Sequence, residues 1–177
     1  MASDKKKIIK YLLRLKQGEG CFDEFVECAI GYVGYVAYKN LACKSFIGDV
    51  ISETFKNVVR YIHTLDSNGN PLAWLCKIAQ NEAYKINNRE QSRNEVGLED
   101  IVESDFSTPD KSDKYLEVID LYKALDSLDE IDRKIIEYIY FDDRKYKDIA
   151  AELCITIGDV HYRKKKALKE LLKILSD

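Results

Sequence analysis

Four consecutive cationic residues, Arg163 to Lys166, lie near the end of a 177-residue chain whose formal net charge is −3. Lysine and arginine side chains neutralise phosphates, and an α-helix that bears them fits the major groove of duplex DNA. A charge run of this kind is more often the solvated face of a helix, so the run alone does not decide between the two. The stretch before it, YKDIAAELCITIGDV, favours a nucleic-acid contact.

The residues before the cationic run have the spacing of two short helices joined by a tight turn. The inner face of the first helix is expected to comprise Ile149, Ala150 and Leu153. The turn falls at 154–155, and Thr156 with Asp159 three residues later forms a capping-box-like start for the second helix, from which Val160 points back to the core. Two helices, a short turn and a cationic second helix over 157–169 predict a helix-turn-helix.

The rest of the chain is also expected to be helical. It has only two prolines and eight glycines, and 46% of its residues are hydrophobic, enough to bury a core. Apolar residues recur at helical spacing over 22–37 and 47–65, and an amphipathic helix is expected over 4–17, within an N-terminal extension of residues 1–19. The turn-forming stretch DSNGNP ends at Pro71, where another helix is expected to begin. We therefore predict an all-α fold.

Charge divides the chain into three parts. Residues 1–93 have 14 Lys and Arg against 10 Asp and Glu, 94–143 have 5 against 16, and 144–177 have 9 against 5. Helical periodicity is lost over 94–114, where acidic residues, Ser, Thr and Pro gather as they do in flexible linkers. The prediction is two small helical domains, 1–93 and 115–177, joined by an acidic flexible linker, with the helix-turn-helix in the second domain.

Metal and catalytic chemistry have little to build on. The only histidines are His63 and His161, and the five cysteines never occur as CxxC, so we expect reduced thiols, no metal site and no cofactor. No nucleophile–base pair or Gly-rich phosphate loop is visible, so neither an enzyme nor catalytic residues are expected. The apolar runs are shorter than the roughly 18 residues of a membrane span, and the amphipathic N-terminus is not typical of a signal peptide. A cytoplasmic protein is expected.

Two groups of motifs resemble the sigma-70 family of bacterial RNA polymerase sigma factors, in its small two-domain extracytoplasmic-function (ECF) class. Residues 115–173 are similar to region four of that family, through Leu128, Arg133, Tyr146, Ile149, Ala150, Leu153, Gly158 and Val160. Residues 20–93 are similar to region two, through Asp49, Glu53, Thr54 and Phe55 of an acidic helix and Ala73, Trp74, Leu75, Ile78, Ala79 and Asn81 of a second helix. The region-three domain of larger sigma factors is absent.

The resemblance implies that the chain is not an enzyme, but binds core RNA polymerase, recognises two promoter elements and helps to open the DNA. Its acidic helix would dock on the clamp helices of the largest polymerase subunit, with candidate contacts at Asp49, Ser52, Glu53, Asn57 and Arg60. The minus-ten element, with one base flipped out, would be bound by Asp66, Ser67, Asn68, Asn70, Trp74, Lys77, Asn81 and Lys85. The minus-thirty-five element would be contacted by Asp159, His161, Tyr162, Arg163, Lys165 and Lys166. The polymerase flap and an anti-sigma factor are the further partners that the resemblance suggests.

Several residues depart from the family's pattern and keep other functions open. Ser52 stands where the family has Gln, and Lys164 replaces a usually apolar residue, so its stem would have to lie along the core. Tyr162 replaces a small residue and Lys85 a frequent Asp, while Trp74 is expected to pack in the core. One alternative is a helix-turn-helix regulator that does not bind polymerase. Another is a degenerate sigma-like protein that sequesters a partner without opening DNA.

Overall fold

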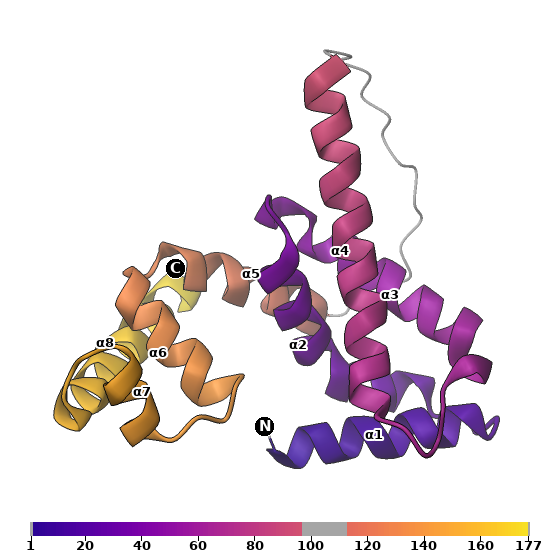
Figure 1. Cartoon of the computed structure of the whole chain (residues 1–177), viewed down its shortest axis with the longest axis horizontal. Coiled ribbons are helices and arrows are strands. Elements are labelled where there is room, and N and C mark those ends of the chain that lie inside the picture. The colour runs from indigo at the N-terminus through magenta and orange to yellow at the C-terminus, as the bar shows by residue number, and fades with distance from the viewer. Residues whose placement is uncertain (1, 97–112, 177) are drawn as a thin grey trace. The chain divides into compact units, whose positions relative to one another are not determined.

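The computed structural model describes residues 2–96 and 113–176, and every regular element in these two stretches is a helix (Figure 1). The predicted all-α fold is confirmed. Most of the predicted linker, 94–114, lies outside the described residues, and the predicted domain boundaries stay a prediction. Contacts divide the chain into two compact units, named here the N-terminal unit (Lys6–Ile119) and the C-terminal unit (Met1–Lys5 with Asp120–Asp177).

The N-terminal unit is built around three mutually packed helices. It contains α1 Ala2–Lys16 from Lys6 onward, α2 Phe22–Asn40, η1 Lys44–Phe46, α3 Ile47–Tyr61, η2 Ile62–Thr64 and α4 Pro71–Val96. Helices α2, α3 and α4 pack against one another, with Phe25, Ile51 and Leu75 fully buried between them. The Phe25 ring meets Phe55 edge-on, with 5.7 Å between the ring centroids. The predicted N-terminal helix is confirmed as α1, which contributes the buried Leu12.

The C-terminal unit contains the predicted helix-turn-helix. Its helices are α5 Asp113–Ser127 from Asp120 onward, α6 Glu130–Tyr140, α7 Tyr146–Glu152 and α8 Ile157–Ser176. Helix α8 packs on α6 and α7 around a core of Ile135, Ile149, Ala150 and Val160, with Leu153 against it. The inner face of α7 and the inward direction of Val160 are therefore as predicted. Residues from all three helices fix how α8 presents its outer side.

The start of α8 is fixed by the capping box that the sequence predicts. The Thr156 hydroxyl accepts the backbone N–H of Asp159 at 3.0 Å. In return, Asp159 Oδ2 accepts the Thr156 backbone N–H at 3.1 Å and its hydroxyl at 2.7 Å. These bonds satisfy backbone groups that the first helical turn leaves unpaired, and they lower the pKa of the Asp159 carboxyl. Asp159 is thus committed to the helix start, although it is also a predicted DNA contact.

The turn before α8 contains a left-handed residue that is not glycine. Cys154 has a φ of 54°, a conformation that costs residues with a Cβ about 1–2 kcal/mol. Cys154→Gly is expected to raise the free energy of unfolding by about 0.5–1 kcal/mol, because the greater entropy of glycine in the unfolded chain offsets part of the relief. Urea unfolding measures the change. Cys154→Ala loses the thiol but keeps the strain, so an equal gain from alanine would contradict the backbone explanation.

Candidate nucleic-acid interface

Two of the four consecutive cations of α8 are held by a buried carboxylate of α6. Asp132 is fully buried; its Oδ1 accepts Arg163 Nη1 at 2.7 Å and its Oδ2 accepts Lys166 Nζ at 3.0 Å. Burial alone would raise the pKa of Asp132, but the hydrogen bonds from the two cations hold it below its usual value. Asp132 therefore ties α6 to α8 and takes up charge that Arg163 and Lys166 were predicted to offer to DNA.

Lys164, the second residue of the run, also has partners within the C-terminal unit. Its Nζ donates to the phenol oxygen of Tyr146 at 2.9 Å and lies 5.4 Å and 5.6 Å from the ring centroids of Tyr140 and Tyr146. Both distances are in the range of cation–π contacts. The hydrogen bond to Tyr146 raises the pKa of Lys164. The predicted position of the Lys164 stem along the core stays a prediction.

The outer side of α8 bears the three predicted contact residues that neither bond to α6 nor form the capping box. Tyr162 is 72% exposed. Lys165 is exposed and makes no hydrogen bond or ion pair with any residue that the structure describes. His161 is exposed too, with its ring edge against Tyr146 at 4.4 Å between centroids. Phenol, ammonium and imidazole groups can contact phosphates and base edges in the major groove. The candidate upstream site is therefore centred on these three side chains.

The loop between η2 and α4 is held in shape by its own polar groups. Asp66 Oδ1 accepts the backbone N–H of Asn68 at 3.0 Å, and the Asp66 carbonyl accepts that of Gly69 at 3.3 Å. A Cβ on Gly69 would lie 3.2 Å from Asp66 Oδ2, so a side chain there would crowd the turn. Asp66, a predicted base contact, is thus used to shape the loop. The Asn68 side chain is exposed on it, as is that of Ser67.

The end of the loop is fixed by the start of α4. Asn70 Oδ1 accepts the backbone N–H of Ala73 at 3.2 Å, and α4 begins at Pro71 as predicted. The expected core position of Trp74 is corrected: the residue is only partly buried, because its indole N–H reaches outward to Thr64 Oγ1 at 3.4 Å. Trp74 therefore joins the first turn of α4 to the end of η2.

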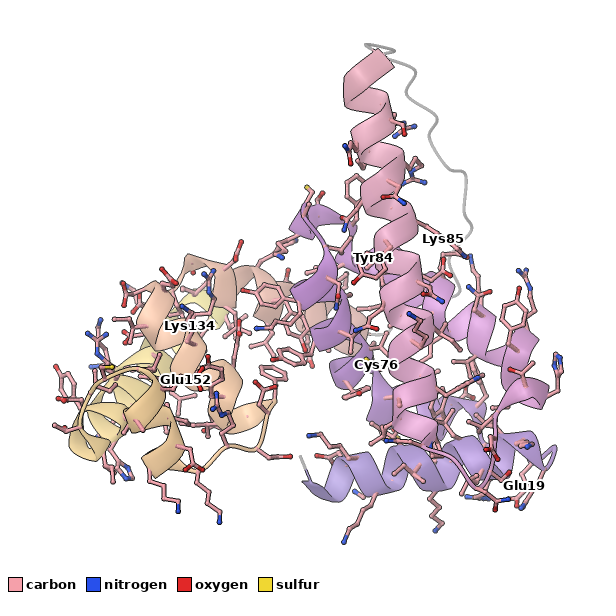
Figure 2. The ribbon with its side chains drawn as sticks, viewed as in Figure 1. Glu19, Cys76, Tyr84, Lys85, Lys134 and Glu152 are labelled. Carbon is pink, nitrogen blue, oxygen red and sulfur yellow. The ribbon has the colours of Figure 1, made fainter. Side chains whose placement is uncertain are left out.

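Beyond the loop, α4 presents a polar stripe beside an open groove. Lys77, Asn81 and Lys85 follow one another at one-turn spacing and are all exposed; Figure 2 labels Lys85 on this helix. The groove, of about 480 Å³, is lined by Asn57, Tyr61, Ile78, Asn81, Glu82, Tyr84, Lys85 and Asn88. Tyr61 and Tyr84 are 44% and 52% exposed. Amide groups and exposed aromatic rings are what unstacked bases bind. Neither tyrosine was predicted as a site residue. The only signal in the sequence is that each lies outside the apolar face of its helix.

A buried glutamate organises the groove. Glu82 Oε1 accepts Asn57 Nδ2 at 3.0 Å and Lys85 Nζ at 2.7 Å. Asn57 was predicted to contact polymerase together with Asp49 and Glu53. The structure corrects that placement: Asn57 is only 6% exposed, and its amide is bonded within the N-terminal unit. Asn57 thus supports the groove, because its bond to Glu82 joins α3 to α4.

The other predicted polymerase contacts lie on α3. Asp49 is exposed in the first turn, and Glu53 one turn later accepts Lys56 Nζ at 2.7 Å. Surface ion pairs contribute only about 0–1 kcal/mol, so Glu53 could exchange this partner for a cation on another protein. Ser52 is partly buried and Arg60 is exposed. Asp49 and Glu53 therefore form a small acidic patch, and its contact with polymerase stays a prediction.

Two family models match the chain. The model of sigma-70 region 2 matches residues 25–93, and that of sigma-70 region 4 matches residues 119–171. The first match includes the acidic patch, the loop and the stripe of α4, and the second includes the helix-turn-helix. Helix α1 lies outside both. No curated protein matches the chain.

The solved structures that are similar to the chain include two sigma-factor complexes. One is the sigma factor RpoE from Bartonella quintana in complex with the anti-sigma factor NepR, 22% identical, covering 89% of this chain and 98% of that chain with a TM-score of 0.41. The other is CnrH in complex with the cytosolic domain of CnrY, 18% identical, covering 98% of this chain and 97% of that chain with a TM-score of 0.41. The family assignment rests on the two region models.

Proposed function

The chain belongs to the sigma-70 family of RNA polymerase sigma factors, in its ECF class, and from this we propose that it binds core RNA polymerase, recognises promoter DNA and promotes transcription initiation. The observation that supports the proposal most strongly is the presence of both region models in chain order, each over a surface suited to nucleic acid. The proposed place of action is the cytoplasm. An anti-sigma partner and a contact with the polymerase flap stay predictions.

The N-terminal unit is proposed to hold the minus-ten element as single strand. A base flipped out of the stack needs polar groups that contact its edges and a cation for its phosphate. The exposed Asn68 on the loop and Asn81 on α4 supply amides, while Lys77 supplies a positive charge. The groove beside Asn81 adds the exposed Tyr84 ring, on which a neighbouring base could stack.

The C-terminal unit is proposed to bind the minus-thirty-five element through α8. The buried Asp132 clamps Arg163 and Lys166, so they set the orientation of α8 more than they contact DNA. Tyr162 and Lys165 lie on the exposed side of α8, where they can contact the major groove of the DNA and its phosphates. On this proposal the cations of the run differ in function. Some hold α8 within the C-terminal unit, and only the rest contact DNA phosphates.

Lys165 and Lys166 are therefore expected to differ as alanine variants in duplex binding. Lys165→Ala should reduce the slope of log affinity against log salt by about one, the value for one lost phosphate contact. Lys166→Ala removes the same formal charge, but its ammonium already has Asp132 as partner, so its slope should change less. Fluorescence anisotropy with promoter duplex over a salt series measures both. Equal changes in the two slopes would contradict the proposal that Lys165 contacts a phosphate and Lys166 does not.

Transcription with purified components tests the whole proposal. Core polymerase with the protein should give run-off transcripts on some members of a library of upstream sequences, and core alone should not. A helix-turn-helix regulator would bind duplex DNA without comigrating with core. A sequestering sigma-like protein would comigrate with core and yield no transcript on any member. Each result removes a different alternative.

Two absences fit the proposal without supporting it. Among the residues that the structure describes, no group of His, Cys, Asp or Glu could hold a metal ion. No described helix is both long enough and apolar enough to cross a membrane. The sigma-70 family is not an enzyme family, and the proposed activity needs no catalytic residue because the chemistry belongs to the polymerase.

A further inference from the structure

Helix α1 makes a contact that the proposed function does not use. Helix α1 lies before residue 25, where the region 2 match begins. From the last turn of α1, Lys16 Nζ donates to the backbone carbonyl of Leu65 and to Ser67 Oγ, the latter at 3.2 Å. The two ends of this second contact are 51 positions apart in the sequence. The contact therefore joins the N-terminal helix to the loop that is proposed to bind the flipped base.

The end of α1 from which Lys16 projects is itself well fixed. Gly18 has a φ of 83°, the left-handed conformation that closes a helix, and the Glu19 backbone N–H returns to the carbonyl of Arg14 at 3.1 Å. The Arg14 and Glu19 side chains pair at 2.5 Å, and Glu19 is labelled at this end of α1 in Figure 2. One turn before Lys16, Leu12 is fully buried. Lys16 thus reaches the loop from a backbone that is anchored on both sides.

The loop has few other supports between its two ends. Leu65 is buried and Asn70 caps α4, so the ends are fixed. Between them, the hydrogen bonds that the described residues make are those within the turn of Asp66 and the one that Ser67 accepts from Lys16. The ammonium of Lys16 holds both the carbonyl where the loop begins and the side chain two residues on. It supports the loop from outside the loop's own segment.

We propose that Lys16 is a positioning residue for promoter opening, and that α1 serves to hold the loop 65–70 ready for an unstacked base. This inference rests on the proposed function. A loop that is already ordered loses less conformational entropy when it binds, so more of its contact energy is left to extract the base. The task is distinct from base contact, because Lys16 acts through Leu65 and Ser67.

The first arm of the test follows the loop in the free protein, without polymerase or DNA. Lys16→Met keeps the length of the stem and removes the ammonium. Steady-state heteronuclear NOE values of the 66–69 backbone amides should fall in this variant, which reports faster picosecond–nanosecond motion. Lys16→Arg should restore them, because a guanidinium can donate to the same two oxygens. Lys10→Met changes an exposed lysine of the same helix and should leave them unchanged.

The second arm measures opening with core polymerase. Permanganate-reactive thymines on duplex promoter should fall about threefold to tenfold for Lys16→Met, the net effect of one ordinary hydrogen bond, because Lys16 acts on the base only through the loop. They should return with Lys16→Arg. On a template that is already melted, Lys16→Met should match the wild type. Core affinity should be equal for the wild type and the three variants.

The outcomes separate this inference from the proposed function. Unchanged NOE values in Lys16→Met overturn the inference whatever happens on DNA. A more mobile loop with normal opening also overturns it, and leaves the proposed function intact. Wild-type protein that opens no promoter counts against the proposed function, while the first arm still reports whether Lys16 orders the loop.

Discussion

Reversing both charges of the acidic patch, by Asp49→Lys with Glu53→Lys, is expected to lower affinity for core polymerase by about 100-fold or more. A cationic partner surface would then face two cations, which adds repulsion to the lost attraction. The second substitution also puts a cation in place of the present ion-pair partner of Lys56, so far-UV circular dichroism should first confirm that helicity is kept. Native gel comigration or interferometry with core polymerase measures the affinity.

A matched control changes the same charge on another helix. Glu24 and Glu27 of α2 are both exposed, so their double replacement by lysine alters the net charge by the same amount. This control should bind core nearly as the wild type does. If both double variants lose affinity equally, the effect is one of net charge. If neither loses affinity, the acidic patch on α3 is not the polymerase contact.

Removing the two exposed amides of the minus-ten site, by Asn68→Ala with Asn81→Ala, is expected to lower open-complex formation about 30-fold. Each lost polar contact to an extruded base should cost about 1 kcal/mol, and extruding a base itself costs a few kcal/mol. The structure makes these two positions better probes than their neighbours. Gly69 has no room for a Cβ without a shift, and Asn70 caps α4, so alanine at either would disturb the loop itself.

Permanganate footprinting on duplex promoter measures this loss, and three readouts define its meaning. Core affinity and duplex binding by α8 should stay near wild type. A pre-melted template should restore most of the transcription, because the DNA then no longer has to be unpaired. Gln80→Ala alters an amide elsewhere on α4 and should have little effect. Equal losses on duplex and pre-melted templates would place the defect after opening.

Features set by neighbouring residues could be predicted from the sequence. The capping box of Thr156 and Asp159 lies within four residues, and Pro71 marks a helix start by its own backbone chemistry. The inward position of Val160 follows from helical periodicity alone. Such features depend on local propensity and spacing, which a single sequence displays directly.

Features made by distant partners could not be predicted in the same way. Arg163 and Asp132 are 31 residues apart, and nothing in the spacing of either indicates that they meet. The same holds for Lys16, whose partner in the loop lies beyond α2 and α3 in the sequence. A cation looks alike in sequence whether it faces a phosphate or a buried carboxylate. The sequence therefore could not show that Asp132 holds two of the cations predicted to contact DNA.

The carboxylate of Asp132 also bears on how this protein could be retargeted. Because Arg163 and Lys166 fasten α8 to α6 from one side, the residues at 161, 162 and 165 can be varied while this tie to α6 is kept. A combinatorial library at those three positions, with Asp132 kept, would explore new promoter preferences on an unchanged scaffold. Variation at 163 or 166 would instead remove a bond to Asp132 and lower the stability of the C-terminal unit. Stability and sequence preference thus depend on different residues of α8.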